Sequence, residues 1–207
     1  MSGEWQRSDE VVVATSNPAK LQEIRALFPN PDIVLVGLDA SRPVPFPEEG
    51  EDYRANAIAK ARAAASQLGC LAIADDSGLE VDALEGAPGP FSARFGGPDL
   101  DDAARLAALL DALEGVPLAE RGARFVCEAA LATPAGETAA RRGECAGTIL
   151  LAPTGRRGFG YDPVFQLDGR SESMAELSPG EKNLLSHRAQ AFRALAPEVA
   201  AHLRSRA

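Results

Sequence analysis

The sequence predicts an α/β protein with a mixed β-sheet, and two observations lead to that fold class. Between residues 11 and 74, short apolar runs typical of buried strands alternate with stretches of helical periodicity. In the second half, two long strand patterns at residues 124–132 and 137–151 follow each other directly, joined by a short turn at 134–136. The alternation predicts parallel pairing and the hairpin predicts antiparallel pairing, so both kinds are expected in one sheet.

The first predicted elements are a strand, a helix and a second strand. Residues 11–14 are a continuous apolar run, typical of a strand buried on both faces. Asn17 is a suitable helix cap, with Pro18 at the first helical position. Apolar side chains then repeat at helical spacing at Leu21, Ile24, Leu27 and Phe28. Prolines at 29 and 31 end this helix, and residues 33–36 predict the second strand.

A long helix and an acidic turn come next. After a loop rich in proline and glutamate, residues 52–68 predict an alanine-rich helix that ends at Gly69. Residues 71–74 predict a short buried strand, which leads into a turn at residues 75–78. Residues 81–84 are a further candidate strand.

The remaining elements are a helix at residues 100–113, the hairpin described above, and a largely helical C-terminal part. A glycine-rich turn at residues 155–163 precedes a short strand near Val164 and Phe165. Ser178 and Glu181 fit a capping box, and Pro197 is a possible interruption of the last helix.

Composition indicates a globular protein. Hydrophobic residues make up 45% of the 207 residues and charged residues 25%, which allows a sizeable core. We expect one domain over residues 11–204, after an N-terminal extension at residues 1–10 that is expected to be flexible.

Charge and cysteine usage restrict the possible partners and the compartment. The net charge of −9 argues against a nucleic-acid partner. The first ten residues lack the apolar run of a signal peptide, and no stretch reaches the length of a membrane span. Three distant cysteines, odd in number, favour reduced thiols over a disulfide framework or a zinc site. We therefore expect a cytoplasmic protein without membrane contact.

Residues 15–20 are the first candidate site. A strand that opens into a helix N-terminus presents backbone N–H groups and a partial positive charge, which suit a phosphate. Lys20 adds a full charge in the first turn. The alternative is an ordinary capped helix with a solvated lysine, because the P-loop motif is absent.

Two adjacent aspartates, Asp75 and Asp76, are the second candidate site. They follow an apolar strand, and open α/β sheets bind ligands at the carboxyl ends of strands. Mg²⁺ takes one or two protein carboxylates and completes its coordination with water and phosphate oxygens. Glu48 and Glu49, in the loop before the long helix, are further acidic candidates, and Lys60 of that helix could point along the same cleft. The alternatives are an Asx-turn at the aspartates and a solvated helix face at Lys60.

The third candidate site combines the turn at residues 158–163 with the segment at residues 178–188. Glycines allow a ligand to approach the backbone, and the turn carries two aromatic rings, Phe159 and Tyr161. An exposed ring offers a stacking surface for a base, although aromatic residues in turns are often only loop anchors. Lys182, His187 and Arg188 would point in different directions on one continuous helix. A shared ligand therefore requires a break, and we predict a new helix that begins near Ser186.

Five of these segments together resemble the Ham1 family of inosine/xanthosine triphosphate pyrophosphatases. In family order, they are Thr15-Ser-Asn-Pro-Ala-Lys20, Ala74-Asp-Asp-Ser-Gly-Leu-Glu-Val-Asp-Ala-Leu84, Gly86-Ala-Pro-Gly-Pro-Phe-Ser-Ala-Arg94, Gly158-Phe-Gly-Tyr-Asp-Pro-Val-Phe165 and Ser186-His-Arg188. The resemblance implies hydrolysis of ITP, dITP, XTP and dXTP to the monophosphate and pyrophosphate, dependent on Mg²⁺. It also implies a homodimer and an elongated mixed sheet flanked by helices, with two lobes around a central substrate cleft.

The resemblance also implies residue roles. Phosphates would be held by Thr15, Ser16, Asn17, Pro18, Ala19 and Lys20, and the triphosphate would also contact Lys60 and Ser77. Glu48 and Asp76 would bind the metal, and Asp76 would act as the general base, with Asp75 as its rival for that role. The base would be held by Phe159, Gly160, Tyr161, Asp162, Lys182, His187 and Arg188.

One departure from the family pattern leaves alternatives open. Where the family usually has Glu-Asn-Ala at the start of the long helix, this chain has Ala55, so a carboxylate is missing unless Glu49, Glu51 or Asp52 replaces it. Rival interpretations are a Maf-type pyrophosphatase with a different base preference and a non-catalytic nucleotide sensor.

Overall fold

The computed structural model describes residues 10–41 and 43–205. The flexible extension predicted over residues 1–10 lies outside these residues, except for Glu10, which begins β1. Within these two ranges, seven strands form one sheet in the order β2-β1-β3-β5-β6-β7, with β4 paired to β3. Among the described residues, no helix combines the length and the apolar character that a bilayer span requires.

The sheet is mixed, as predicted. Its strands are β1 (Glu10–Val13), β2 (Val34–Gly37), β3 (Leu71–Val81), β4 (Pro88–Gly89), β5 (Gly122–Ala132), β6 (Thr138–Ile149) and β7 (Phe165–Leu167). The strand β1 pairs in parallel with β2 and β3, whereas β3, β5, β6 and β7 are antiparallel neighbours. The parallel pairs follow helical crossovers, and β5 and β6 follow from the predicted hairpin.

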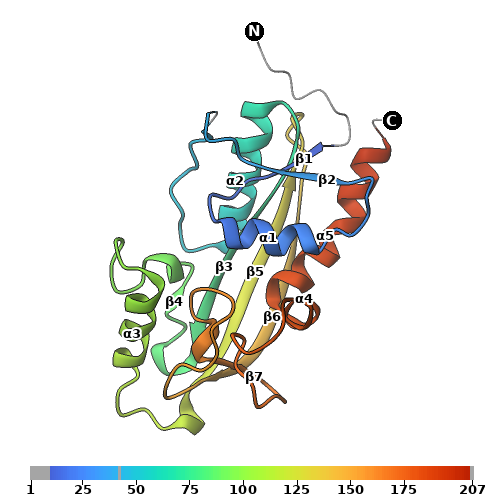
Figure 1. Ribbon diagram of the computed structural model, residues 1–207. Helices are drawn as coiled ribbons and strands as arrows, with labels where there is room; N and C mark the ends of the chain where they lie inside the picture. Colours follow the sequence, from blue (N-terminus) through green and yellow to red (C-terminus); the bar gives the residue numbers. More distant parts are fainter. Residues whose placement is uncertain (1–9, 42, 206–207) are drawn as a thin grey trace.

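In the part of the chain that the structure describes, five helices flank the sheet, accompanied by four short 3₁₀ turns. The helices are α1 (Pro18–Ala26), α2 (Tyr53–Leu68), α3 (Asp102–Ala112), α4 (Pro179–Leu185) and α5 (His187–Arg204). Figure 1 shows α1, α2 and α5 around the upper half of the long strands and α3 beside the lower half. The elongated sheet with helices gathered around two parts of its length matches the predicted architecture.

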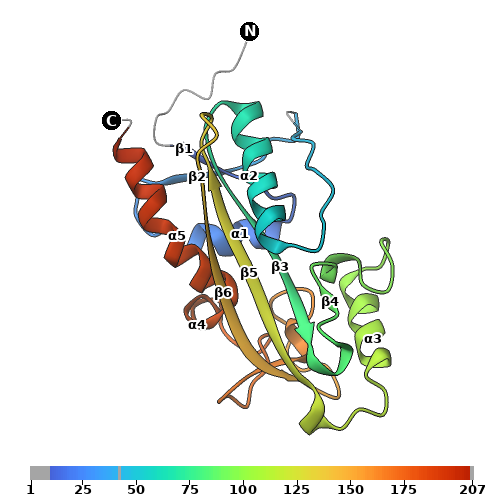
Figure 2. The ribbon, with the colours of Figure 1, turned by 180° about the vertical axis from the view of Figure 1, so that it is seen from behind.

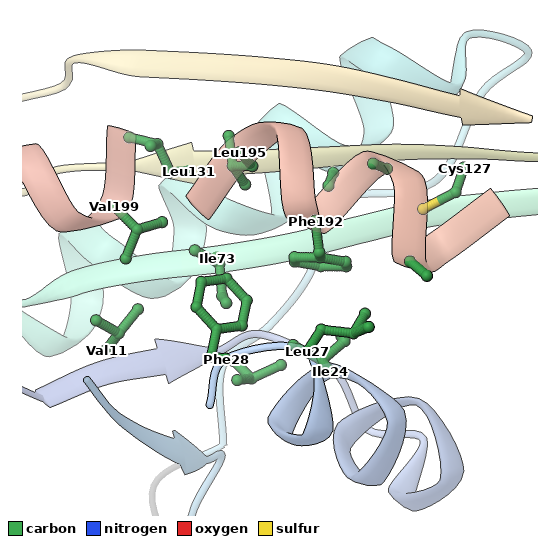
Figure 3. Close-up of a cluster of buried hydrophobic side chains, with 14 of the residues drawn as sticks. Val11, Ile24, Leu27, Phe28, Ile73, Cys127, Leu131, Phe192, Leu195 and Val199 are labelled. Carbon is green, nitrogen blue, oxygen red and sulfur yellow. The ribbon is translucent and has the colours of Figure 1, made fainter. Parts of the chain in front are cut away.

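Alternate residues of β3 face different helices. Ala72 and Ala74 pack in a cluster with the alanines of α2, and the small side chains allow close helix–sheet packing. Ile73 faces the other side, where it packs with Phe192 of α5 and Phe28, which follows α1 (Figure 3). Figure 2 shows the long strands between α2 and α5 from behind. A third apolar cluster, which includes Leu109 of α3, supports the lower part of the sheet.

The predicted acidic turn at residues 75–78 is wrong, because β3 continues through it to Val81. Residues 72–81 pair continuously with β5, so the backbone of the two aspartates belongs to the sheet. The predicted strand at residues 81–84 is also wrong, since Asp82–Leu84 is a 3₁₀ turn. Local sequence could not show this, because β5, the partner that extends β3, lies some 50 residues further along the chain.

The helix break predicted near Ser186 is confirmed. Ser178 and Glu181 form the capping box of α4, and Ser186 then caps α5 by accepting a bond from the N–H of Ala189. The interruption considered at Pro197 does not occur, since α5 runs through it.

Gly143 of β6 allows α5 to approach the sheet closely. A Cβ at this position would lie 2.2 Å from the carbonyl oxygen of His187 and 2.6 Å from the nitrogen of Ala191. The missing side chain therefore brings the first turn of α5, with His187 and Arg188, against the sheet.

Candidate active site

The candidate site lies where β3 loses a neighbour. β1 pairs with β3 only as far as Ile73, and β4 joins the same edge only at Leu79 and Glu80. Between these points the two aspartates and Ser77 have β5 on one side and no named strand on the other. Side chains from both faces of the sheet can therefore meet a ligand around this open edge.

Asp75 is buried on the α1 and α5 side and is surrounded by cations. Its Oδ2 lies 3.0 Å from Nζ of Lys20 and 3.2 Å from Nη2 of Arg188, and it accepts a bond from the hydroxyl of Ser77. Burial alone would raise the pKa of Asp75, but Lys20 and Arg188 hold it well below its usual range. Asp75 therefore favours its ionised form and forms ion pairs with both cations.

Asp76 points to the opposite face, toward α2. Its Oδ1 lies 2.9 Å from Nζ of Lys60, and its Oδ2 accepts a bond from the side-chain amide of Asn56. Burial raises the pKa of Asp76 above its usual value, and Lys60 and Asn56 only partly oppose this. Of the two aspartates, Asp76 has the pKa better suited to accepting a proton near neutral pH.

Lys60 and Asn56 are buried and are not the solvated face that the alternative required. Asn56 also donates to the carbonyl of Gly50 and accepts from its N–H, which fastens the acidic loop to α2. Lys60 reaches Glu49 of that loop at 2.6 Å, whereas Glu48 is exposed. The side chain of Glu49 therefore lies beside Lys60, next to Asp76.

Lysines from both faces of the sheet act on one carboxylate, Glu49, at the open edge of β3. Although burial opposes it, Lys60, Lys20 and Arg94 all lower the pKa of Glu49. Lys20 belongs to the Asp75 side and Lys60 to the Asp76 side, so both act on one loop carboxylate. A polyanion that crosses this edge would meet both lysines.

The N-terminus of α1 forms as predicted, but its first amides are already bonded. Oδ1 of Asn17 accepts bonds from the N–H groups of Ala19 and Lys20, at 2.9 and 3.2 Å. The expectation of free N–H groups is therefore wrong for these two residues. Attraction for an anion here rests on the helix dipole and on the side chain of Lys20.

A pocket of about 310 Å³ opens on the Asp75 side of the sheet. Ten of the residues predicted to bind substrate line it: Asn17, Lys20, Ser77, Phe159, Gly160, Tyr161, Asp162, Lys182, His187 and Arg188. Thr15, Ser16 and Pro18 instead line a neighbouring pocket of about 440 Å³, and Ala19 lines a third of about 220 Å³. The 310 Å³ pocket thus brings together Asn17 and Lys20, Ser77, residues 159–162, and the side chains of Lys182, His187 and Arg188.

Two buried cations and an aromatic ring form one wall of the 310 Å³ pocket. Nζ of Lys182 lies 4.8 Å and the guanidinium of Arg188 lies 5.6 Å from the centre of the Phe159 ring. Asp162 binds Lys182 at 2.5 Å, and burial raises the pKa of this carboxyl although Lys182 opposes the shift. The wall presents hydrogen-bond donors beside a stacking surface.

Glu23 of α1 was not predicted, yet it contacts both cations of this wall. Its two carboxylate oxygens lie 2.7 Å from Lys182 and 2.6 Å from Arg188. Burial opposes the shift, but Arg188 and Lys182 lower the pKa of Glu23. The available signal was its spacing, since Glu23 lies three residues after Lys20 on the same helix face.

His187 is buried and favours its neutral form. Its ring stacks on Phe125 at 4.7 Å, and Nδ1 lies 3.9 Å from the sulfur of Cys145. Burial, with Arg188 and Lys182 nearby, lowers the pKa of His187 well below its usual value. A neutral imidazole can present either a donor or an acceptor to a ligand.

Oxygen donors for a hard cation gather on the Asp76 side. Within residues 10–41 and 43–205, no group of three or more His, Cys, Asp or Glu side chains is close enough to hold a metal ion by itself. Mg²⁺ needs only one or two protein carboxylates when phosphate oxygens complete its coordination. Asp76 with a carboxylate of the 48–49 loop fits that requirement.

A model of the Ham1 family matches residues 11–198. The chain belongs to the Ham1 family. Among its Ham1 relatives, the chain is 47% identical to a protein from Streptomyces avermitilis named dITP/XTP pyrophosphatase, over 91% of this chain and 96% of the relative. A protein of the same name from Geobacillus kaustophilus is 48% identical, over 88% of this chain and 90% of the relative.

Solved Ham1 structures share the fold. A HAM1 protein from Coxiella burnetii is 40% identical with a TM-score of 0.82, over 93% of this chain and 98% of that one. The Ham1 protein of Staphylococcus aureus is 37% identical with a TM-score of 0.81, with the same coverage. The family and fold predicted from five motifs are therefore confirmed.

Proposed function

We propose that this Ham1 protein hydrolyses non-canonical purine nucleoside triphosphates, namely ITP, dITP, XTP and dXTP, to the monophosphate and pyrophosphate. The relatives named dITP/XTP pyrophosphatase support the proposal. The observation that carries it is the open edge of β3, where Lys20 and Lys60 bind adjacent aspartates from opposite faces beside a pocket lined with donors. A triphosphate can lie across this edge while its base occupies the pocket.

Phosphate binding then depends on the lysines and on a divalent cation. Lys20 and Lys60 neutralise phosphate charge, and Ser77 offers a hydroxyl beside Asp75. We assign Mg²⁺ to Asp76 and to a carboxylate of the preceding loop, with Glu48 as the family-implied ligand and Glu49 as its neighbour. When bound, the ion offsets the negative charge on the phosphate oxygens.

Asp76 is the general base in this proposal. Release of pyrophosphate requires water to attack the α-phosphorus in line with the leaving group, and a positioned carboxylate can accept the proton of that water. In the metal-free protein burial raises the pKa of Asp76, whereas Lys20 and Arg188 hold the pKa of Asp75 down. Asp75 keeps its charge and positions Lys20 and Arg188 instead.

Base selection follows from the donors of the pocket wall. Hypoxanthine and xanthine carry a keto oxygen at C6, which accepts a bond from Lys182 or Arg188, whereas the C6 amine of adenine would face donors with a donor. Phe159 lies under the same cations and offers a stacking surface. A mismatch that leaves buried polar groups unpaired discriminates by about 10⁴-fold.

The test measures pyrophosphate and orthophosphate released from ITP, XTP, GTP, ATP and dTTP, with and without Mg²⁺. We expect pyrophosphate from ITP and XTP in the presence of Mg²⁺, and a loss of at least about 10²-fold in kcat for Asp76→Asn. Preference for dTTP or canonical nucleotides would instead identify a Maf-type activity. Nucleotide binding without turnover would identify a sensor.

The homodimer and the cytoplasmic location that were expected stay predictions. Light scattering coupled to size-exclusion chromatography measures the first, and fractionation of the source cells measures the second.

A further inference from the structure

Glu128 of β5 is a buried carboxylate beside Asp76 that no motif identifies. The residue is 5% exposed, and it is the register partner of Asp76 in the antiparallel pairing of β3 with β5. Register partners in an antiparallel pair point to the same face, with Cβ atoms about 4.5–5.5 Å apart. Glu128 therefore shares the α2 face of the sheet with Asp76.

The contacts of Glu128 leave one oxygen without a partner. Oε1 lies 3.6 Å from Nη1 of Arg142, which is itself 43% exposed and donates through Nε to Glu144. Oε2 has no hydrogen-bond partner among the described residues and is shielded from solvent. A buried carboxylate oxygen without a partner costs free energy, so a structural role alone explains Glu128 poorly.

Glu128 brings a second carboxylate beside Asp76, its register partner. Lys60 binds Asp76 and Glu49, whereas the ion pair of Glu128 is the 3.6 Å contact with Arg142. Like charges on register partners destabilise a sheet. A divalent cation, or the water it binds, would satisfy Oε2 and offset the repulsion.

The other acidic residues considered as substitutes for Ala55 are engaged or exposed. Asp52 caps α2 by accepting bonds from the N–H groups of Arg54 and Ala55, and Glu51 is exposed. Ala55 itself is exposed and lines a shallow groove on the outer side of α2. Unlike these residues, Glu128 of β5 is buried, and it lies beside Asp76.

We propose that Glu128 is a positioning residue for the divalent cation, acting on the ion or its bound water together with Asp76. This inference rests on the proposed function, which puts the cation at Asp76. It predicts that Glu128 contributes to cation affinity in the absence of nucleotide.

The experiment measures Mn²⁺ binding to the nucleotide-free protein by electron paramagnetic resonance, with Mg²⁺-induced shifts in Tm as a second readout. We expect Glu128→Gln and Glu128→Met to weaken Mn²⁺ binding about 10-fold, the usual effect of losing a group that orients metal ligands. Both variants should also show a smaller Mg²⁺-induced rise in Tm. Glu144→Gln is the matched control, because it removes the other carboxylate bound to Arg142 and should leave both readouts unchanged.

Three results of this experiment would contradict the inference about Glu128. If Asp76→Asn loses Mn²⁺ binding while both Glu128 variants bind it as the wild type does, the inference about Glu128 fails and the proposed function stands. If the wild type binds no Mn²⁺, or Asp76→Asn binds it normally, the metal site itself is wrong and the inference fails with it. A loss equal in Glu144→Gln and Glu128→Gln would assign the effect to Arg142 and overturn the proposal.

Discussion

Replacing Glu23 with glutamine tests whether this residue holds the two base-contacting cations in place. Glutamine keeps the size of the side chain and one acceptor oxygen, but it removes the charge shared by Lys182 and Arg188. Both cations keep a second carboxylate partner, Asp162 for Lys182 and Asp75 for Arg188. The variant should therefore fold, with a looser pocket wall.

The expected loss of stability follows from the burial of the Glu23 side chain. Removing one partner of a buried ion pair costs about 3–5 kcal/mol. The side chain of Glu23 is 16% exposed and glutamine still accepts a bond, so we expect the free energy of unfolding to fall by about 2–3 kcal/mol. For a chain of this size that corresponds to a Tm lower by about 5–10 °C. The preference for ITP over ATP should fall by up to about 10-fold, or 1.4 kcal/mol.

Urea denaturation and kcat/KM for ITP and ATP measure these effects. Because Arg188 and Lys182 lower the pKa of Glu23 despite its burial, its contribution is complete above about pH 5 and is lost as the pH falls. The difference between wild type and variant should therefore shrink on acidification. Glu198→Gln is the control, since it removes a half-exposed pair with Arg141 worth at most about 1 kcal/mol. Equal stability of Glu23→Gln and Glu198→Gln, with an unchanged ratio of kcat/KM for ITP and ATP, would refute the role of Glu23.

Three further predictions concern α5 and its surroundings. Because burial lowers the pKa of His187, the wild type should lose up to about 1.4 kcal/mol of stability per pH unit below pH 6. Urea denaturation at a series of pH values measures this slope, which should flatten in His187→Asn but persist in the control His202→Gln. Ser186→Ala removes the cap of α5 and should cost about 1 kcal/mol, whereas a neutral effect by calorimetry would contradict the capping bond. Gly143→Ala should lower the free energy of unfolding by about 1–3 kcal/mol and raise KM for ITP, because the new Cβ meets the backbone of α5. If the variant has wild-type stability and KM, α5 does not depend on this close approach.

Local sequence determined much of this protein. Asn17 with Pro18 and Ser178 with Glu181 predicted helix starts, because a cap needs only neighbours three residues away. The break at Ser186 followed from the geometry of one helix, since three donors cannot share a ligand on a continuous α-helix. Five short motifs in order were sufficient for the family.

The course of β3 was decided by pairing with a distant strand. The aspartates looked like a turn, because two acids after an apolar run usually end a strand. They lie inside β3 because β5 supplies a continuous partner from Ala72 to Val81. Strand alternation then puts Asp75 and Asp76 on opposite faces, with different cations and opposite pKa shifts.

Contacts between distant elements also decided which further side chains lie at the site. Glu23 and Glu128 carry no motif, and each is brought to the site by a contact between elements far apart in sequence. The sequence by itself therefore determined the caps, the helix break and the family. Only the tertiary structure decided which face each charge occupies and which partner holds it, because strand register and burial arise from contacts across the whole chain.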